Sequence, residues 1–203
     1  MAGQMRLYYN PKSRAATARW MLEEVGARYD LVHLDFEAGE NRKPDFLAVN
    51  PMGKLPTLVL EDGTVLTETP AIVAWLADAF PDAGLAPPVG SPARGRYYRW
   101  LMFNGSCLEP AAIEKLMRKD AAPLPKVSVG WGSYDDVVDT LEGALGQGPY
   151  LLGERFSAAD LMIGSTLAWL AMFGAPRISE STLIQEYVER ITDREARRRA
   201  QED

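Results

Sequence analysis

The chain has 203 residues, an apolar fraction of 47% and a formal net charge of -6. This length allows one or two domains, and the apolar fraction is ample for a packed core. The acidic balance argues against a surface that neutralises nucleic-acid phosphates, so we expect no nucleic-acid partner. No apolar run approaches the roughly 20 residues that a membrane-spanning helix needs, and MAGQMRLYY is not typical of a secretory signal. We therefore expect a cytoplasmic protein without a membrane partner.

The chain contains one cysteine, Cys107, and one histidine, His33. A single cysteine excludes an intrachain disulfide, and the lack of a Cys/His cluster argues against any metal site of the zinc type. His33 lies within a predicted strand and no GxSxG motif is present, so a Ser-His-Asp hydrolase is not indicated. We expect Cys107 to be buried rather than reactive.

The first 80 residues alternate between strand-like and helix-like patterns. Residues 5–9 and 29–34 have the short apolar pattern of strands, and SRAATARWMLEEVG between them has helical spacing and ends at Gly26. A strand, a helix and a second strand in this order imply a parallel pair with a right-handed connection.

A hairpin and a helix follow in the sequence. Residues 57–60 and 64–67 flank Glu61-Asp62-Gly63, and an Asp-Gly pair between apolar runs predicts an antiparallel hairpin. A helix is predicted over 70–79, before Pro81. We therefore predict an α/β domain with a mixed four-stranded sheet.

The rest of the chain reads as helices and loops after a proline- and glycine-rich linker. We place the boundaries at 1–82 for the α/β domain, 83–91 for the linker and 92–203 for an all-α domain. Its predicted helices cover 92–119, 131–146, 157–173 and 180–199. Ser157 and Asp160 fit a capping box at the third helix.

Two other features of this half stand out. The loop 121–132 is long for a helical domain, which is typical of a functional or flexible segment. The stretch 194–199 contains four arginines, which we interpret as a solvated helix end rather than a nucleic-acid arm.

A polar turn follows the first strand, in the segment Tyr9-Asn10-Pro11-Lys12-Ser13-Arg14. A helix that begins near residue 14 directs its free amides and the positive end of its dipole towards whatever Ser13 faces. Ser13 either caps this helix or donates a hydrogen bond to a bound anion.

Two more polar joints lie in the middle of the α/β domain. Pro56 opens a strand and either forms a cis bond, which leaves the backbone of Leu55 free to pair with an extended peptide, or only starts an edge strand. Thr69 and Pro70 fit the N-cap and first position of a helix. Glu68 is not needed for that cap, and together with Thr69 it could hold the ammonium and carboxylate groups of an amino acid.

These segments, in this order, resemble the glutathione transferase superfamily. The resemblance is carried by LYYNPKSRAATARWMLEEVG, by NPMGKLPTLVLEDGTVLTETPAI and by GERFSAADLMIG, and it extends over nearly the whole chain. It implies a thioredoxin-like N-terminal domain that binds glutathione as a cosubstrate, and an all-α C-terminal domain that forms much of the electrophile pocket. It also implies a homodimer.

The resemblance assigns roles by position. The backbone of Leu55, ahead of a cis Pro56, would pair with the cysteinyl part of glutathione, and Glu68 and Thr69 would hold its γ-glutamyl end. Lys54 and Asn41 would reach the glycyl carboxylate.

Ser13 matches the serine that some classes use to stabilise the glutathione thiolate, and Tyr9 is close to the tyrosine that others use. We favour Ser13, because it lies at the helix start. Classes with a cysteine in this turn have it where Arg14 stands, which argues against mixed-disulfide chemistry on the protein.

We therefore predict a glutathione transferase that joins the glutathione thiolate to a small hydrophobic electrophile. A glutathione-dependent isomerase or dehalogenase, or a non-catalytic glutathione-binding or assembly module, are the alternatives. Four residues at helical spacing are candidates for the electrophile pocket, although core or dimer contacts explain such a stripe better: Tyr97, Trp100, Phe103 and Asn104.

Overall fold

The computed structural model describes residues 4–118 and 121–202. It contains two compact units, one formed by residues up to 83 together with those from 194 onwards, the other by residues 84–193. The sequence had assigned residues 194–202 to the all-α domain. The structure instead groups them with the α/β unit.

The α/β unit is built on a four-stranded sheet with the order β2-β1-β3-β4. Strands β1 (Met5–Tyr9) and β2 (Tyr29–His33) are parallel. Strand β3 (Thr57–Val59) pairs antiparallel with β1 and with β4 (Val65–Thr67). The hairpin turns at Gly63, whose φ of 88° favours glycine. The predicted mixed sheet is confirmed.

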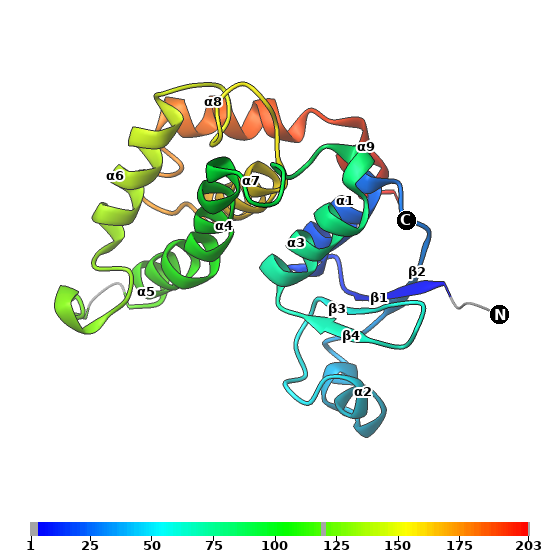
Figure 1. Cartoon of the computed structure of the whole chain (residues 1–203). Coiled ribbons are helices and arrows are strands. Elements are labelled where there is room, and N and C mark those ends of the chain that lie inside the picture. Colours follow the sequence, from blue (N-terminus) through cyan, green and yellow to red (C-terminus); the bar gives the residue numbers. More distant parts are fainter. Residues whose placement is uncertain (1–3, 119–120, 203) are drawn as a thin grey trace. The chain divides into compact units, whose positions relative to one another are not determined.

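Helices cover both faces of this sheet (Figure 1). Helices α1 (Ala15–Val25) and α3 (Thr69–Ala79) pack together on one face, over the fully buried Leu7, and α1 ends at Gly26 as predicted. Helix α2 (Pro44–Val49) lies on the other face, where the rings of Tyr8 and Phe46 are 5.0 Å apart. Short 3-10 turns precede α2 and follow α3, at Glu40–Arg42 and Pro81–Ala83.

The predicted helix 180–199 is wrong, because it is interrupted. Helix α8 (Thr182–Thr192) ends before Arg194, whose backbone is extended, and α9 (Glu195–Arg199) starts anew. Arg194 then forms a 2.6 Å ion pair with Glu24 of α1. Arg199 pairs with Glu23 at 2.9 Å, and Arg197 lies over the ring of Trp20. Our interpretation of these arginines as a solvated helix end is therefore wrong for Arg194, Arg197 and Arg199, which contact α1, whereas Arg198 is exposed.

The second unit is helical. A continuous run contains α4 (Pro92–Phe103), a π-helical turn (Asn104–Leu108) and α5 (Glu109–Met117). The predicted end of this helix, residue 119, lies outside the described residues. Helix α6 (Tyr134–Leu145) starts later than predicted, because the Ser133 side chain caps it by accepting from the Asp136 amide.

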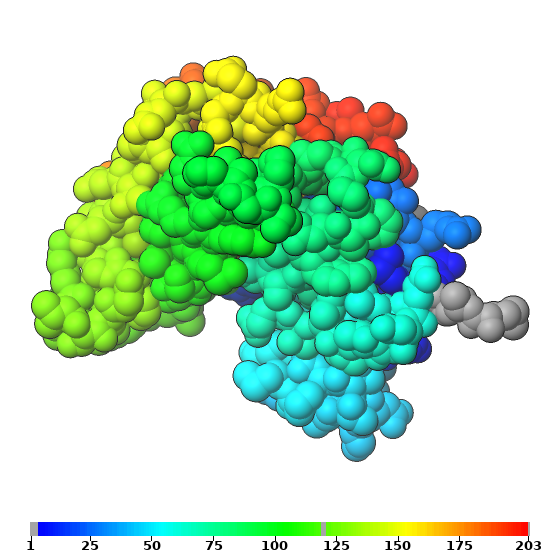
Figure 2. All heavy atoms as spheres, in the orientation of Figure 1, coloured from blue at the N-terminus to red at the C-terminus, as the bar shows by residue number. Residues whose placement is uncertain are grey.

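Helix α7 (Ala158–Met172) lies at the centre of this unit, with most of its residues buried. The predicted capping box of Ser157 and Asp160 is confirmed at its start. The loop before α6 contains one 3-10 turn (Lys126–Ser128), is exposed from residue 121 to 128 and lies on the surface in Figure 2. No helix in the described part of the chain has the length and apolarity to cross a bilayer.

Candidate functional site

Three of the segments singled out in the sequence meet at one end of the sheet. Thr57 of β3 pairs with Tyr8 of β1 on one side and with Thr67 of β4 on the other. Because β3 is antiparallel to both neighbours, its amino end lies beside their carboxyl ends. The turn after β1, the residues before β3 and the joint after β4 therefore share this end, on strands about 4.8 Å apart.

The peptide bond between Leu55 and Pro56 is cis, as predicted. Pro56 is buried and Leu55 is half-buried. Within the described residues, neither the N–H nor the C=O of Leu55 forms a hydrogen bond. This backbone is therefore free to pair with a ligand in an extended conformation.

Two buried residues that sequence reasoning missed fix the backbone before Leu55. The carbonyl oxygen of Lys54 accepts hydrogen bonds from Asn50 Nδ2 at 2.9 Å and from Thr57 Oγ1 at 3.0 Å. Asn50 Nδ2 also donates to Thr57 Oγ1. Asn50 is 3% exposed and Thr57 is fully buried. A buried amide of this kind gives no local signal in a sequence, because its partners are set by the fold.

Asn41 and Lys54 differ in how their side chains are used. The amide of Asn41 donates to the carbonyl of Gly53 at 3.0 Å. Gly53 has a φ of 62°, and a Cβ there would lie 2.7 Å from the Asn41 carbonyl oxygen, so this tight loop requires glycine. Lys54 is exposed and forms no ion pair within the residues that the structure describes. Asn41 thus holds the loop, and Lys54 extends from it.

Helix α3 begins one residue earlier than predicted. Glu68 occupies the N-cap position and Pro70 the second helical position, so our assignment of Thr69 as the N-cap is wrong. Glu68 has φ 66° and ψ 114°, a conformation that costs a non-glycine residue roughly 1–3 kcal/mol. Its exposed carboxylate has no partner among the described residues, and Thr69 beside it is 6% exposed.

The turn that holds Ser13 is closed by its own hydrogen bonds. Ser13 Oγ donates to the Asn10 carbonyl at 2.7 Å and accepts from the Ala15 amide at 3.1 Å. The Asn10 side chain donates to the Leu34 carbonyl at 2.8 Å and accepts from the Lys12 amide at 2.9 Å. Ser13 therefore lies at the start of α1, as expected, but its hydroxyl is occupied.

Tyr9 has a different environment. It is 3% exposed, because alternate residues of β1 face α1, and its ring meets His33 edge-on with centroids 5.4 Å apart. The guanidinium of Arg19 lies 5.2 Å from the ring centroid of Tyr9. The structure thus places Ser13, Leu55 and Glu68 at one end of the sheet and buries Tyr9 beneath α1.

The aromatic stripe of α4 belongs to the core, as we favoured. Tyr97 and Trp100 are 0% and 3% exposed, and Asn104 is fully buried. Phe103 is half-buried, and its ring meets that of Trp100 at 5.4 Å. Cys107 is half-buried, so the expectation that it is buried holds only in part.

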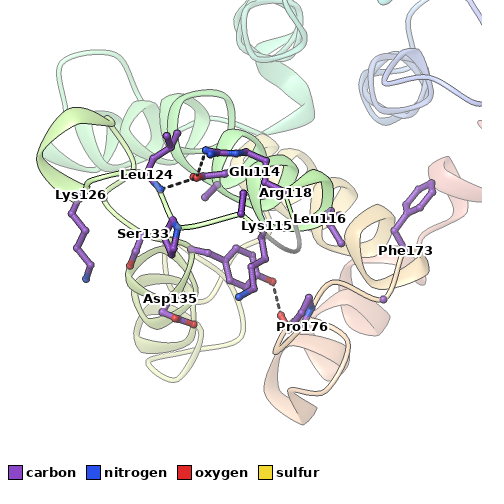
Figure 3. Close-up of a pocket in the computed structure, with 16 residues that line it drawn as sticks. Glu114, Lys115, Leu116, Arg118, Leu124, Lys126, Ser133, Asp135, Phe173 and Pro176 are labelled. Atoms are coloured by element: carbon purple, nitrogen blue, oxygen red, sulfur yellow. Dashed lines mark hydrogen bonds and ion pairs between the residues drawn. The ribbon is translucent and has the colours of Figure 1, made fainter.

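The helical unit contains a cavity of about 550 Å³ (Figure 3). It lies between α5, the start of α6 and the chain after α7, with the loop that precedes α6 as a further wall. Glu114 ties that loop to α5, since its carboxylate accepts from the Leu124 amide and from Trp131 Nε1, each at 3.1 Å. The Tyr134 hydroxyl donates to the Pro176 carbonyl, and burial raises the pKa of Tyr134 to about 12. This volume is typical of a small-molecule site.

No group of three or more His, Cys, Asp or Glu side chains in the described residues is arranged to hold a metal ion.

Comparison with known proteins identifies the family. The family described as "Glutathione S-transferase, N-terminal domain" matches residues 3–78, and "Glutathione S-transferase, C-terminal domain" matches residues 110–200. Glutathione S-transferase GstA of Escherichia coli O157:H7 is 33% identical, over 81% of this chain and 82% of that protein.

A solved structure and a second relative extend the comparison. The sphingomonad glutathione S-transferase complexed with glutathione is 30% identical with a TM-score of 0.79, covering 96% of each chain. Maleylacetoacetate isomerase of Pseudomonas aeruginosa is 27% identical, over 84% of this chain and 83% of that protein. The α/β unit with its mixed sheet, followed by a helical unit, is the glutathione S-transferase fold, with a thioredoxin-like first domain. The chain belongs to the glutathione S-transferase family.

Proposed function

We propose that this protein binds glutathione at the end of its sheet and transfers the glutathione sulfur to a small hydrophobic electrophile. One observation carries the proposal. Leu55 offers an unpaired backbone N–H and C=O, and Glu68 offers an unpaired carboxylate, at the same end of the sheet. A γ-glutamyl peptide with an ammonium group at one end fits this pair of features.

The binding roles follow from the chemistry of each group. The cysteinyl residue of glutathione pairs with the Leu55 backbone, as an added strand would. Glu68 accepts hydrogen bonds from the γ-glutamyl ammonium, and the Thr69 hydroxyl donates to the adjacent carboxylate. Lys54 attracts the glycyl carboxylate. Asn41 donates one amide hydrogen to Gly53, and its second is available for the same carboxylate.

The chemical step needs a thiolate, because the thiol itself is a weak nucleophile. Ser13 donates a hydrogen bond to the thiolate sulfur, and the amino end of α1 favours the negative charge. The thiol proton leaves to solvent, the sulfur forms a bond to the electrophilic carbon, and a leaving group such as halide departs with the bonding electrons. Tyr9 is the alternative donor, but its burial under α1 argues against it.

The cavity of the helical unit is our candidate for the hydrophobic cosubstrate site. Its volume suits a molecule of drug size, and apolar side chains form much of its wall: Ala111, Leu116, Pro123, Leu124, Phe173 and Pro176. A homodimer remains a prediction from the family resemblance, and analytical ultracentrifugation tests it.

A second candidate function is a glutathione-dependent cis–trans isomerisation, supported by the similarity to maleylacetoacetate isomerase. It would use the same thiolate, added to a double bond and then eliminated, so the glutathione-binding residues do not distinguish the two reactions.

The test has two stages. Calorimetry measures glutathione binding, and turnover is then measured on a panel of aryl halides, epoxides, peroxides and a maleyl substrate. We expect binding and conjugation of at least one halide or epoxide. Absence of glutathione binding overturns the proposal. Turnover of the maleyl substrate alone identifies the isomerase, and binding without any turnover identifies a glutathione-binding module.

A further inference from the structure

Two segments outside the regular helices form part of the wall of the cavity in the helical unit (Figure 3). One is the chain that follows α7, which contributes Gly174 and Pro176. The other is the loop of residues 121–132, which contributes several lining residues between Ala121 and Gly132. Helix α5 and the start of α6 supply most of the remaining wall. Access to the cavity therefore depends on how firmly each of the two segments is held.

The chain that follows α7 is held firmly by charged hydrogen bonds. Arg177 has a φ of 64°, a conformation that a non-glycine residue keeps only where the surrounding structure supports it. The Tyr134 hydroxyl at the start of α6 donates to the Pro176 carbonyl. The Arg177 guanidinium donates to three carboxylates of α6, at 3.1, 2.6 and 2.9 Å: Asp135, Asp139 and Glu142. Hydrogen bonds of this kind are stronger than neutral ones, so this wall is fixed to α6.

The loop has fewer ties to the helices. Glu114 of α5 provides the main one, because its carboxylate accepts from the Leu124 amide and from Trp131 Nε1, each at 3.1 Å. Lys126 Nζ also pairs with Asp136 at 2.8 Å, but their side chains are 63% and 50% exposed. An ion pair as exposed as this contributes little. A single half-buried carboxylate therefore holds most of the loop in place.

The loop combines a stiff part with a flexible point. Pro123 and Pro125 restrict the backbone, and the Ser128 amide donates to the Pro125 carbonyl at 2.9 Å. Gly130 follows, and a Cβ there would meet no atom within 4 Å beyond its chain neighbours. Its carbonyl is contacted by Cys107 Sγ, at a distance of 3.9 Å. The freedom of a glycine backbone allows the stiff part to move as one body.

We propose that residues 121–132 form a lid, which turns about Gly130 to admit an apolar ligand to the cavity and is held closed by the Glu114 carboxylate. Glu114 is a positioning residue, because it acts through Leu124 and Trp131. When the lid is closed, Pro123 and Leu124 form part of the cavity wall, so a bound ligand favours the closed state. The inference rests on the part of the proposed function that places a hydrophobic cosubstrate here, and it needs no glutathione chemistry.

The first test uses the wild-type protein without glutathione. The probe is N-phenyl-1-naphthylamine, a neutral apolar fluorophore. Trypsin cleaves after lysine, and Val127, which follows Lys126 in the lid, is 98% exposed. A saturating concentration of the probe should slow cleavage of the 126–127 bond at least threefold, measured by mass spectrometry. Cleavage after Arg155, which is exposed and does not line the cavity, is the control and should keep its rate.

The second test measures the association rate constant of the probe by stopped-flow fluorescence. Glu114→Ala should raise it at least threefold, because only the open fraction of the protein admits the probe. Glu114→Gln keeps one acceptor oxygen and should give an intermediate rate. Gly130→Ala should lower the rate at least twofold, since alanine fits at this position and restricts the backbone. Glu186→Ala is the matched control, because Glu186 is an exposed acid of α8 that does not line the cavity.

Three results would overturn the proposal. They are the absence of probe binding, an unprotected 126–127 bond, and association rates that are unchanged in both Glu114→Ala and Gly130→Ala. If Glu114→Ala does not fold, the protection of the wild-type protein and the Gly130→Ala variant still decide. A protein that passes these tests but does not bind glutathione would refute the proposed function alone. Glutathione binding together with unchanged probe rates would refute only the lid.

Discussion

The segment from Leu55 to Thr69 and the turn that holds Ser13 lie at the same end of the sheet, yet they use their polar groups differently. In the first, the backbone of Leu55 and the carboxylate of Glu68 have no partners within the described chain. In the second, the Ser13 hydroxyl both donates to the Asn10 carbonyl and accepts from the Ala15 amide. We call the segment from Leu55 to Thr69 the open side, because its polar groups are available to a ligand. We call the Ser13 turn the closed side, because its hydroxyl is already hydrogen-bonded within the turn.

This difference predicts that the open side binds glutathione and that the closed side acts in the chemical step. Ligand groups can reach Leu55 and Glu68 without breaking an existing bond, so we expect this side to set the affinity for glutathione. Ser13 must exchange its bond to Asn10, worth about 1 kcal/mol net, for a bond to a charged sulfur, worth about 1.5–3 kcal/mol. The exchange is favourable only when a thiolate is present, so we expect Ser13 to promote ionisation of the glutathione thiol.

Removal of the Glu68 carboxylate tests the open side most directly. Glu68→Ala should raise the dissociation constant of glutathione about ten- to hundredfold, because a charged hydrogen bond contributes about 1.5–3 kcal/mol. Calorimetry measures the change. Glu61→Ala is the control, since Glu61 is also an exposed acid of this unit but lies in the hairpin turn. Equal constants for both variants would contradict the role of Glu68.

The second-largest effect is expected from a change at Asn50, which holds the backbone before Leu55 in place. Asn50→Ala removes donors to Lys54 and Thr57, and we expect a loss of about 2 kcal/mol in the free energy of unfolding. Glutathione binding should also weaken, because the Leu55 backbone loses its fixed position. Urea unfolding and calorimetry measure the two effects. Asn41→Ala, which removes one half-buried bond, should cost less stability, and the reverse ranking would refute this account.

The variants of Asn50 and Asn41 also show which features of the structure can be predicted from the sequence and which cannot. The strands and the hairpin at Gly63 are predictable because short-range patterns specify them, whereas the cis bond before Pro56 was implied only by the family resemblance. Asn50 is not, because its partners depend on how the loop folds back. The break at Arg194 was missed for a similar reason. Its partner, Glu24, is 170 positions away in the chain, and helical periodicity contains no information about such a pair.

The same limit applies within the candidate site. The sequence correctly indicates that Ser13 lies at the start of a helix, but it does not indicate that the hydroxyl is bound to Asn10. The positive φ of Glu68 was also unforeseen, because non-glycine residues adopt it only where the surrounding fold imposes it.

Loss of the Ser13 hydroxyl tests the closed side. Ser13→Ala should raise the pKa of the bound glutathione thiol by about one unit, which is about 1.4 kcal/mol, and lower the rate near neutral pH about tenfold. The pH–rate profile should shift to higher pH, because the thiolate then forms only there. Ultraviolet absorbance of the thiolate measures the pKa. Ser13→Thr keeps a hydroxyl and should retain the wild-type profile, while an unshifted pKa in Ser13→Ala would exclude Ser13 as the donor.

The strained backbone at Glu68 should have a smaller effect, on the free energy of unfolding. This effect can be distinguished from the loss of the carboxylate by comparing two variants. Glu68→Gly and Glu68→Ala both lack the carboxylate, but only glycine adopts a φ of 66° without steric cost. The glycine variant should therefore be more stable than the alanine variant by about 1 kcal/mol in urea unfolding, while both bind glutathione equally weakly. Equal stability would show that the backbone relaxes when the side chain is removed.

Tyr9→Phe should have the smallest effect. The Tyr9 ring is held between His33 and Arg19 under α1, so removal of its hydroxyl should change the turnover number less than about twofold and cost about 1 kcal/mol of stability. The contrast with Ser13→Ala is the informative measurement. If Tyr9→Phe abolished turnover and Ser13→Ala did not, the thiolate would be held from the α1 face of the sheet. The hydrogen bonds of Ser13 with Asn10 and Ala15 would then be purely structural.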